Sequence, residues 1–208
     1  MKKMTLMLFV AFLSVATVSA QFKLGVRAGF NASTITNTPE GTGISNYFLP
    51  GFQVGLMAQY LITPQFGIES GLYYSTLGIK SEVEAIKTTT TSNPSYLQVP
   101  ITALYKFDAG LGLYLYPQAG VYVGYGLGGK IKAKGEIGGM TGTGDVDYFS
   151  DKTNRFDMGL TLGFNVQHSN LVIGLGYDLG LLKINKESVT DKDLKNGNIK
   201  VTVGYFFF

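Results

Sequence analysis

The residues of this 208-residue chain that could best carry out chemistry are acids and bases on the polar side of segments in which polar and apolar residues alternate. They are Arg27, Glu69, Arg155, Asp157, Asp178 and Lys200. Carboxylates beside cations in a narrow interior can form ion pairs, line a selective polar path or act as a general acid and base. We expect an ion-pair network, because unpaired charges in a confined space are costly. The polar path and the acid–base pair are the alternatives.

The composition excludes most other kinds of catalytic site. The chain has no Cys and one His, so it lacks the ligands of a thiolate or multi-histidine metal centre and the nucleophile of a thiol enzyme. That residue, His168, lies in the short segment QHSN, which we expect to be a solvated turn. We therefore predict a protein that is not an enzyme and uses no cofactor or metal.

The first twenty residues differ from the rest. Lys2 and Lys3 precede an apolar stretch, and small residues follow up to Ala20, which is typical of a cleaved secretory signal peptide. The predicted domains are a signal peptide over 1–20 and one mature domain over 21–208. Without Lys2 and Lys3 the mature chain has 15 basic and 14 acidic residues, so its charge favours no nucleic-acid partner.

Apolar and polar residues alternate with period two through most of the mature chain. Phe22, Leu24 and Val26 share one face, for example, while Lys23 and Arg27 share the other. The segments with this alternation are 22–31, 51–61, 66–75, 95–107, 111–127, 155–166, 171–181 and 198–208. Most have the ten or eleven residues that a tilted strand needs to cross a bilayer.

Short and long connections alternate between these segments. The short ones are 62–65, 108–110 and 167–170, and the long ones, rich in Thr, Ser, Asn, Gly and Lys, are 32–50, 76–94, 128–154 and 182–197. Barrels of the bacterial outer membrane have short periplasmic turns and long outer loops. The pattern predicts an all-β protein: an eight-stranded antiparallel up-and-down transmembrane β-barrel with solvated outer loops.

The polar face indicates which side of the barrel is inside. It holds mostly Gly, Gln, Thr and Tyr rather than Lys and Glu, which suits a narrow interior better than a surface in water. Aromatic residues on the apolar face gather near both strand ends, as in the interfacial belts of membrane proteins. A soluble barrel with its apolar face inward would alternate too, but this composition disfavours it.

Several segments resemble the outer-membrane β-barrel domain family often described as PorT-like, with the architecture of small OmpA/OmpX-type barrels: YLQVPITALYKF, LYPQAGVYVGYGL, RFDMGLTLGFNV, GLGYDLGLLKI and VTVGYFFF. The resemblance implies insertion by the outer-membrane barrel assembly machinery and an accessory role in protein secretion. It also implies an assembly signal at Gly204, Tyr205 and Phe208. Strict alternation points Phe208 inward, so we expect a bulge or a frayed end there.

The long segment 128–154 contains three alternating lysines followed by three acids: Lys130, Lys132, Lys134, Asp145, Asp147 and Asp151. Charge complementarity favours a hairpin extension, and the lysines are candidates to contact lipopolysaccharide phosphates. We predict a structural or partner-interaction role in the envelope, with lipid, lipopolysaccharide and envelope proteins as partners. The alternative is a narrow or gated pore for ions or small polar solutes, which the small interior of eight strands disfavours.

Overall fold

The computed structural model describes residues 21–36, 44–83, 88–137, 140–149, 153–183 and 195–207. The predicted signal peptide at 1–20 lies outside the described residues. Strands and their connections make up the described part, which contains no helix long and apolar enough to cross a membrane.

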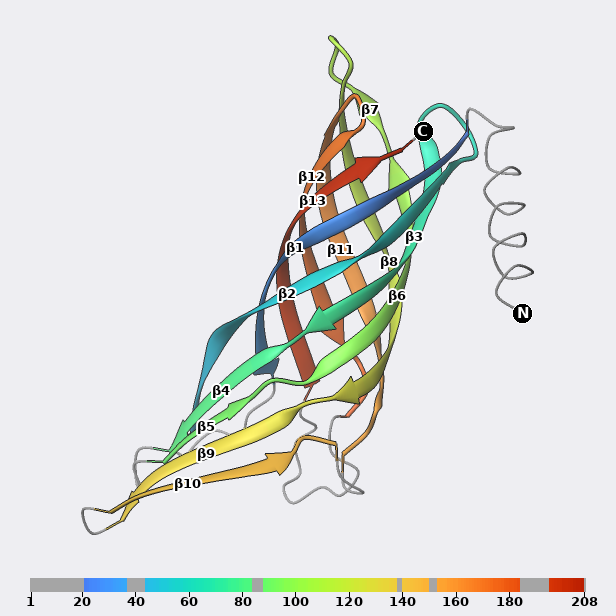
Figure 1. The fold of residues 1–208 in the computed structure, drawn as a ribbon. Coiled ribbons are helices and arrows are strands. Elements are labelled where there is room, and N and C mark those ends of the chain that lie inside the picture. The colour runs from blue at the N-terminus through green and yellow to red at the C-terminus, as the bar shows by residue number, and fades with distance from the viewer. Residues whose placement is uncertain are drawn as a thin grey trace, which may run out of the picture.

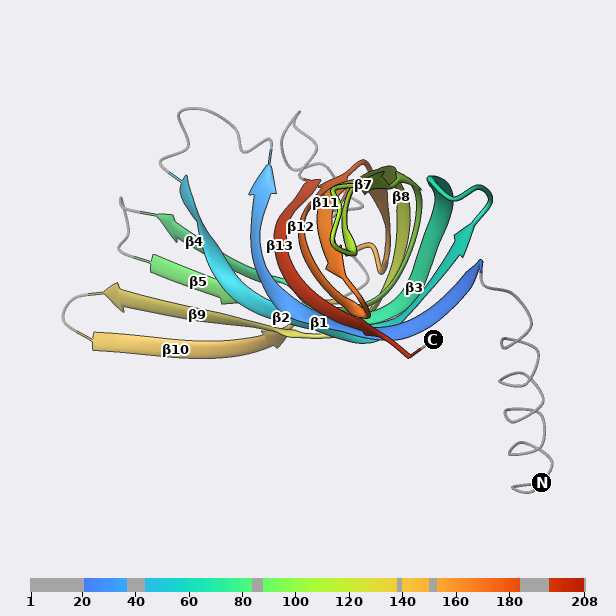
Figure 2. The same cartoon turned by 90° about the horizontal axis from the view of Figure 1, so that it is seen from above.

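Eight long antiparallel strands form a closed barrel (Figures 1 and 2). They are β1 (Phe22–Thr36), β2 (Ile44–Leu61), β3 (Phe66–Thr76), β6 (Ser95–Tyr105), β8 (Leu113–Gly128), β11 (Phe156–His168), β12 (Leu171–Gly180) and β13 (Lys195–Phe206). Each pairs with the next, and β1 closes the barrel by pairing with both β2 and β13. The predicted eight-stranded up-and-down barrel is confirmed.

Side chains point alternately into and out of this barrel. On β3, Glu69 and Tyr73 are buried, whereas Ile68, Leu72 and Tyr74 are exposed. The other strands follow the same rule, so a continuous apolar surface surrounds a polar interior. A surface of this size is unfavourable in water and suits the hydrocarbon of a membrane.

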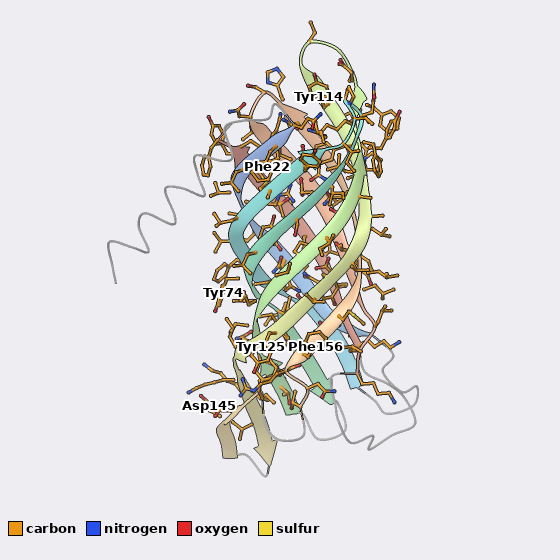
Figure 3. The ribbon with its side chains drawn as sticks, turned by 90° about the vertical axis from the view of Figure 1, so that its right-hand side faces the viewer. Phe22, Tyr74, Tyr114, Tyr125, Asp145 and Phe156 are labelled. Atoms are coloured by element: carbon orange, nitrogen blue, oxygen red, sulfur yellow. The ribbon has the colours of Figure 1, made fainter. Side chains whose placement is uncertain are left out.

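Aromatic side chains mark the two ends of the apolar surface. Figure 3 shows Phe22 near the end with the short turns and Tyr74, Tyr125 and Phe156 toward the opposite end. The start of β1 and the end of β13 lie at the short-turn end (Figure 1). In the outer membrane this end is periplasmic, because short turns face the periplasm.

Beyond the opposite end, the barrel wall continues as a sheet that we call the extension. Its strands are β4 (Gly78–Val83), β5 (Thr88–Ser92), β9 (Lys130–Ile137) and β10 (Met140–Asp147). β4 pairs with the first part of β2, and β5, β9 and β10 follow in order. Figure 2 shows the extension leaving the barrel wall sideways, with β10 at its outer edge. At the periplasmic end, the short β7 (Phe107–Asp108) pairs with β8.

The extension corrects part of the loop prediction. The segments 32–50 and 76–94 are largely strand rather than loop, because β1 and β2 run past the barrel rim and β4 and β5 pair with each other between β2 and β9. The Thr-rich run at 88–92 was expected to be a solvated loop. Thr is β-branched and favours a strand once neighbouring strands supply a ladder, as β4 and β9 do here. β13 likewise begins at Lys195 rather than at residue 198.

The hairpin predicted within 128–154 is confirmed. β9 and β10 pair so that Asp145 lies opposite Lys132 and Asp147 lies opposite Lys130. Opposite charges in directly facing positions stabilise an antiparallel pair. Asp151 lies outside the described residues.

Candidate functional site

Two ion pairs lie inside the barrel. Arg27 Nη1 donates to Glu69 Oε1 over 2.6 Å, and the side chains are only 7% and 4% exposed. Lys200 Nζ donates to Asp178 Oδ1 over 2.6 Å, nearer the outer end. Gln59 Nε2 also donates to Glu69 Oε2 over 3.1 Å. Four charged side chains inside the wall are thus brought together in two pairs.

Both ion pairs line one small polar cavity of about 40 Å³. Arg27 uses one guanidinium nitrogen in its ion pair, while its Nε and Nη2, Gln118 Oε1 and Asn165 Nδ2 are buried without a partner among the described side chains. A water molecule needs roughly 10–15 Å³ and two to four polar partners. The cavity therefore has room for about three waters, far less than an open aqueous channel.

Arg155 and Asp157, the other two members of the predicted network, form no ion pair with another described residue, and this part of the prediction needs correction. Arg155 is exposed at the outer rim, where Nη1 donates to the Gly126 carbonyl over 3.1 Å. Asp157 is buried and accepts from neutral groups, Tyr122 Oη at 3.2 Å and Asn196 Nδ2 at 2.9 Å. Arg155 directly precedes β11, which begins at Phe156, and its guanidinium lies over the Phe149 ring, with Cζ 5.1 Å from the ring centre.

An apolar cluster fills the periplasmic end of the lumen. We call the buried side chains of this cluster the inner seal: Met57, Leu104, Tyr116, Val172 and Phe206, with Tyr73 above them. Lys106 lies beside it, with Nζ donating to Gln167 Oε1 over 2.8 Å and 5.2 Å from the Tyr116 ring centre. All of these residues belong to the barrel strands or directly adjoin them, so the inner seal is part of the wall itself.

A second buried cluster lies at the outer end of the barrel. Phe149, just after β10, packs edge-on against Tyr96 with ring centres 5.5 Å apart and against Tyr148 at 4.9 Å. Leu77 belongs to the same buried cluster, which we call the outer seal. Gly126 makes room for it, because a Cβ there would lie 2.1 Å from the Phe149 ring.

Burial within the outer seal raises the pKa of Tyr148 to about 12, since desolvation disfavours the phenolate. The sequence reasoning missed this seal. Its one signal was the adjacent pair Tyr148 and Phe149 in an otherwise polar segment, which the outer-loop prediction left without a role.

The remaining predicted residues lie apart from the lumen. Lys130 and Lys132 are exposed on β9, and Lys134 follows on the same strand. His168 is exposed at the end of β11, beside a periplasmic turn. Among the described residues there is no group of three or more acids or histidines that could hold a metal.

The C-terminal residues predicted as an assembly signal are described only in part. Gly204 is buried, and Tyr205 is 49% exposed on the lipid-facing side. Phe206 is buried in the inner seal and Phe207 is 50% exposed, so the alternation stays regular through this point without a bulge. Phe208 lies outside the described residues.

The sequence matches the model of a known protein family. Over residues 16–186 the chain matches the model of a family described as outer membrane protein beta-barrel domain. No curated protein sequence matches it.

Solved structures with similarity to the chain include Ail of Yersinia pestis in complex with the heparin analogue sucrose octasulfate, at 19% identity and a TM-score of 0.43, covering 90% of this chain and 99% of that one. OprG of Pseudomonas aeruginosa has 13% identity and a TM-score of 0.45, covering 90% and 96%. Neisserial surface protein A has 15% identity and a TM-score of 0.42, covering 88% and 96%. Because the family model spans most of its length, the chain belongs to the outer membrane protein beta-barrel domain family and is an outer-membrane protein.

Proposed function

We propose that this protein is a non-conducting, non-enzymatic outer-membrane barrel that binds envelope partners through its extension. The observation that carries this proposal is the filled lumen. Side chains close it at the inner seal and the outer seal, and two ion pairs cross the space between them. Such an interior serves to hold the wall together rather than to pass solute.

The extension supports an interaction role. It carries the exposed charges Lys130, Lys132, Asp145 and Asp147, and Figure 3 shows Asp145 beyond Tyr125 and Phe156 of the outer aromatic belt. A barrel that only had to be inserted and stable would not need a sheet that projects from its rim. A contact between the lysine row and lipopolysaccharide phosphates, and an accessory part in protein secretion, are both forms of this role.

Export and insertion complete the proposal. We assign residues 1–20 as a signal peptide removed before Gln21, and Gly204, Tyr205 and Phe208 as the signal read by the barrel assembly machinery. Masses of the mature protein in isolated outer membranes test the first assignment: a mature N-terminus at Gln21 supports it, and retention of residues 1–20 rejects it.

A narrow pore is the second candidate function, favoured by the polar cavity between the ion pairs. It requires both seals to open at the same time. Since the inner seal is built from the barrel strands themselves, we rank the interaction role first.

Cross-linking in native outer membranes tests the interaction role. Lysine-reactive cross-linkers should join the exposed lysines of β9 to specific envelope molecules. The matched control replaces 131–146 by a short turn, which removes the β9–β10 hairpin and keeps Tyr148 and Phe149. Loss of the specific links in the control supports the proposal, whereas links that survive hairpin removal, or the absence of specific links in the natural protein, contradict it.

A further inference from the structure

The outer edge of the extension has backbone hydrogen-bonding groups that no strand in the described part of the chain uses. We propose that the free edge of β10 binds an extended segment of a partner protein that carries Lys or Arg at alternate positions, and adds it to the sheet as a further strand. This inference rests on the proposed interaction role and names the kind of partner that the role requires.

The register of the hairpin shows which backbone groups are free. Tyr148 N donates to Gly129 O over 3.0 Å, and the same register sets Val146 opposite Ile131. Opposed residues of an antiparallel pair alternate between hydrogen-bonded and non-hydrogen-bonded positions. Every second residue before Tyr148 therefore bonds to β9, and Val146 is one of them. Asp145 and Asp147 lie at the positions between, so their backbone N–H and C=O groups point away from β9.

No described strand pairs with that side of β10, which ends the sheet order. Unpaired edge groups are the template for strand addition, in which main-chain hydrogen bonds supply affinity and alternate side chains supply specificity. The edge lies outside the barrel and beyond the outer aromatic belt, where a partner can reach it (Figures 2 and 3).

The exposed acids set the charge of the partner. Asp145 and Asp147 lie on one face of β10, with Lys132 and Lys130 directly opposite them on β9. Each of the two carboxylates would face one side chain of a strand added at the free edge of β10, and these facing side chains would lie two residues apart in the added strand. Lys or Arg at alternate positions would continue the alternation of charge across the sheet, since facing opposite charges stabilise a strand pair.

The other face of β10 admits a bulky apolar side chain. Val146 is 61% exposed, and a Cβ on Gly144 would meet no atom within 4 Å. A large apolar residue of an added strand could cover Gly144 and pack beside Val146, as aromatic residues do over edge glycines. The partner segment therefore alternates basic and bulky apolar residues.

A second copy of this chain fits the edge less well. Paired antiparallel with itself over 141–147, β10 would set Asp145 opposite Thr143 and diagonally opposite Asp145 of the other copy, with Asp147 of each copy on the same face. Like charges at these positions destabilise a strand pair. The acids thus disfavour self-association and favour a basic partner.

Peptide binding to the full barrel in lipid nanodiscs tests the inference. The probe is a short fluorescent peptide that alternates Lys and Tyr, and the control peptide carries Glu in place of Lys. Asp145→Pro removes an edge N–H that β9 does not use, while Asp145→Ala removes only the carboxylate. We expect the Lys peptide alone to bind, more weakly in Asp145→Ala and weaker by a further factor of about ten or more in Asp145→Pro.

Equal binding of the Lys peptide by the natural protein and by Asp145→Pro would overturn the inference, as would no binding up to about 1 mM. Retained heat-modifiable mobility on gels verifies that each variant still folds as a barrel. A photo-reactive residue at Val146 in native membranes separates the two proposals. Links that persist in Asp145→Pro leave the interaction role intact and reject the edge, whereas no specific link in either protein rejects the interaction role itself.

Discussion

The Arg27–Glu69 ion pair gives the sharpest quantitative test of the filled lumen. Both side chains are almost fully buried and their charged atoms lie 2.6 Å apart. Glu69→Gln keeps the shape of the side chain but leaves the Arg27 charge without its counter-ion. Removal of one partner of a buried pair costs about 3–5 kcal/mol, because an uncompensated charge remains in a poorly solvated site. We expect Arg27→Met to cost a similar amount, since Glu69 then retains only Gln59.

The double variant, Arg27→Met with Glu69→Gln, should recover most of this loss. A buried ion pair replaced by neutral groups is often close to neutral in stability, so the coupling free energy should reach about 2 kcal/mol or more. The assay is urea-dependent folding into lipid vesicles, followed by the gel shift between folded and unfolded barrel, because the chain has no Trp for fluorescence. Single variants that lose less than about 0.5 kcal/mol, the typical range of surface sites, would refute a tightly packed interior.

Three further predictions concern the two seals. Gly126→Ala should displace the Phe149 ring, since the new Cβ would lie 2.1 Å from it, and should raise protease cleavage near this segment while Gly144→Ala, which meets open space, leaves cleavage unchanged. Alkaline pH should open the outer seal, because the folded-state pKa of Tyr148 of about 12 exceeds the ordinary value of about 10. The stability of the outer seal should therefore be constant below pH about 10 and fall as the pH rises toward 12. Hydrogen exchange of this segment measures that fall, and constant protection to pH 12 would contradict the assignment. Met57→Ala should cost about 2–5 kcal/mol in the same urea assay, because Met57 is fully buried in the inner seal, and a loss within the surface range would argue against a packed seal.

The barrel could be predicted from the sequence because the direction of each side chain depends only on its position within its own strand. A residue such as Val26 or Arg27 faces lipid or lumen according to its place in a period-two pattern, and each strand repeats the pattern independently. The polar interior followed from the same rule. The strand at 88–92 was not predicted, because it depends on pairing with β4 on one side and, on the other, with β9, which is about forty residues further along the chain.

The candidate site was predictable in composition but not in pairing. The sequence placed Arg27, Glu69, Asp178 and Lys200 in the lumen, but which charges meet depends on strand register and stagger. Arg155 shows the limit: its position next to β11 suggested a place in the lumen, yet it ends at the rim beside Gly126. The outer seal could not be read from alternation, because Phe149 reaches the mouth only after the hairpin folds back.

Single-channel recording in planar bilayers tests the central claim, a barrel closed at both ends, most directly. A sixteen-stranded porin serves as the positive control, since barrels of that size enclose an aqueous channel. We predict no discrete conductance from the natural protein, and none from Phe149→Ala, because the inner seal remains. Reproducible current steps from the natural protein that change with Asp178→Asn would show an open path through the lumen and contradict the account.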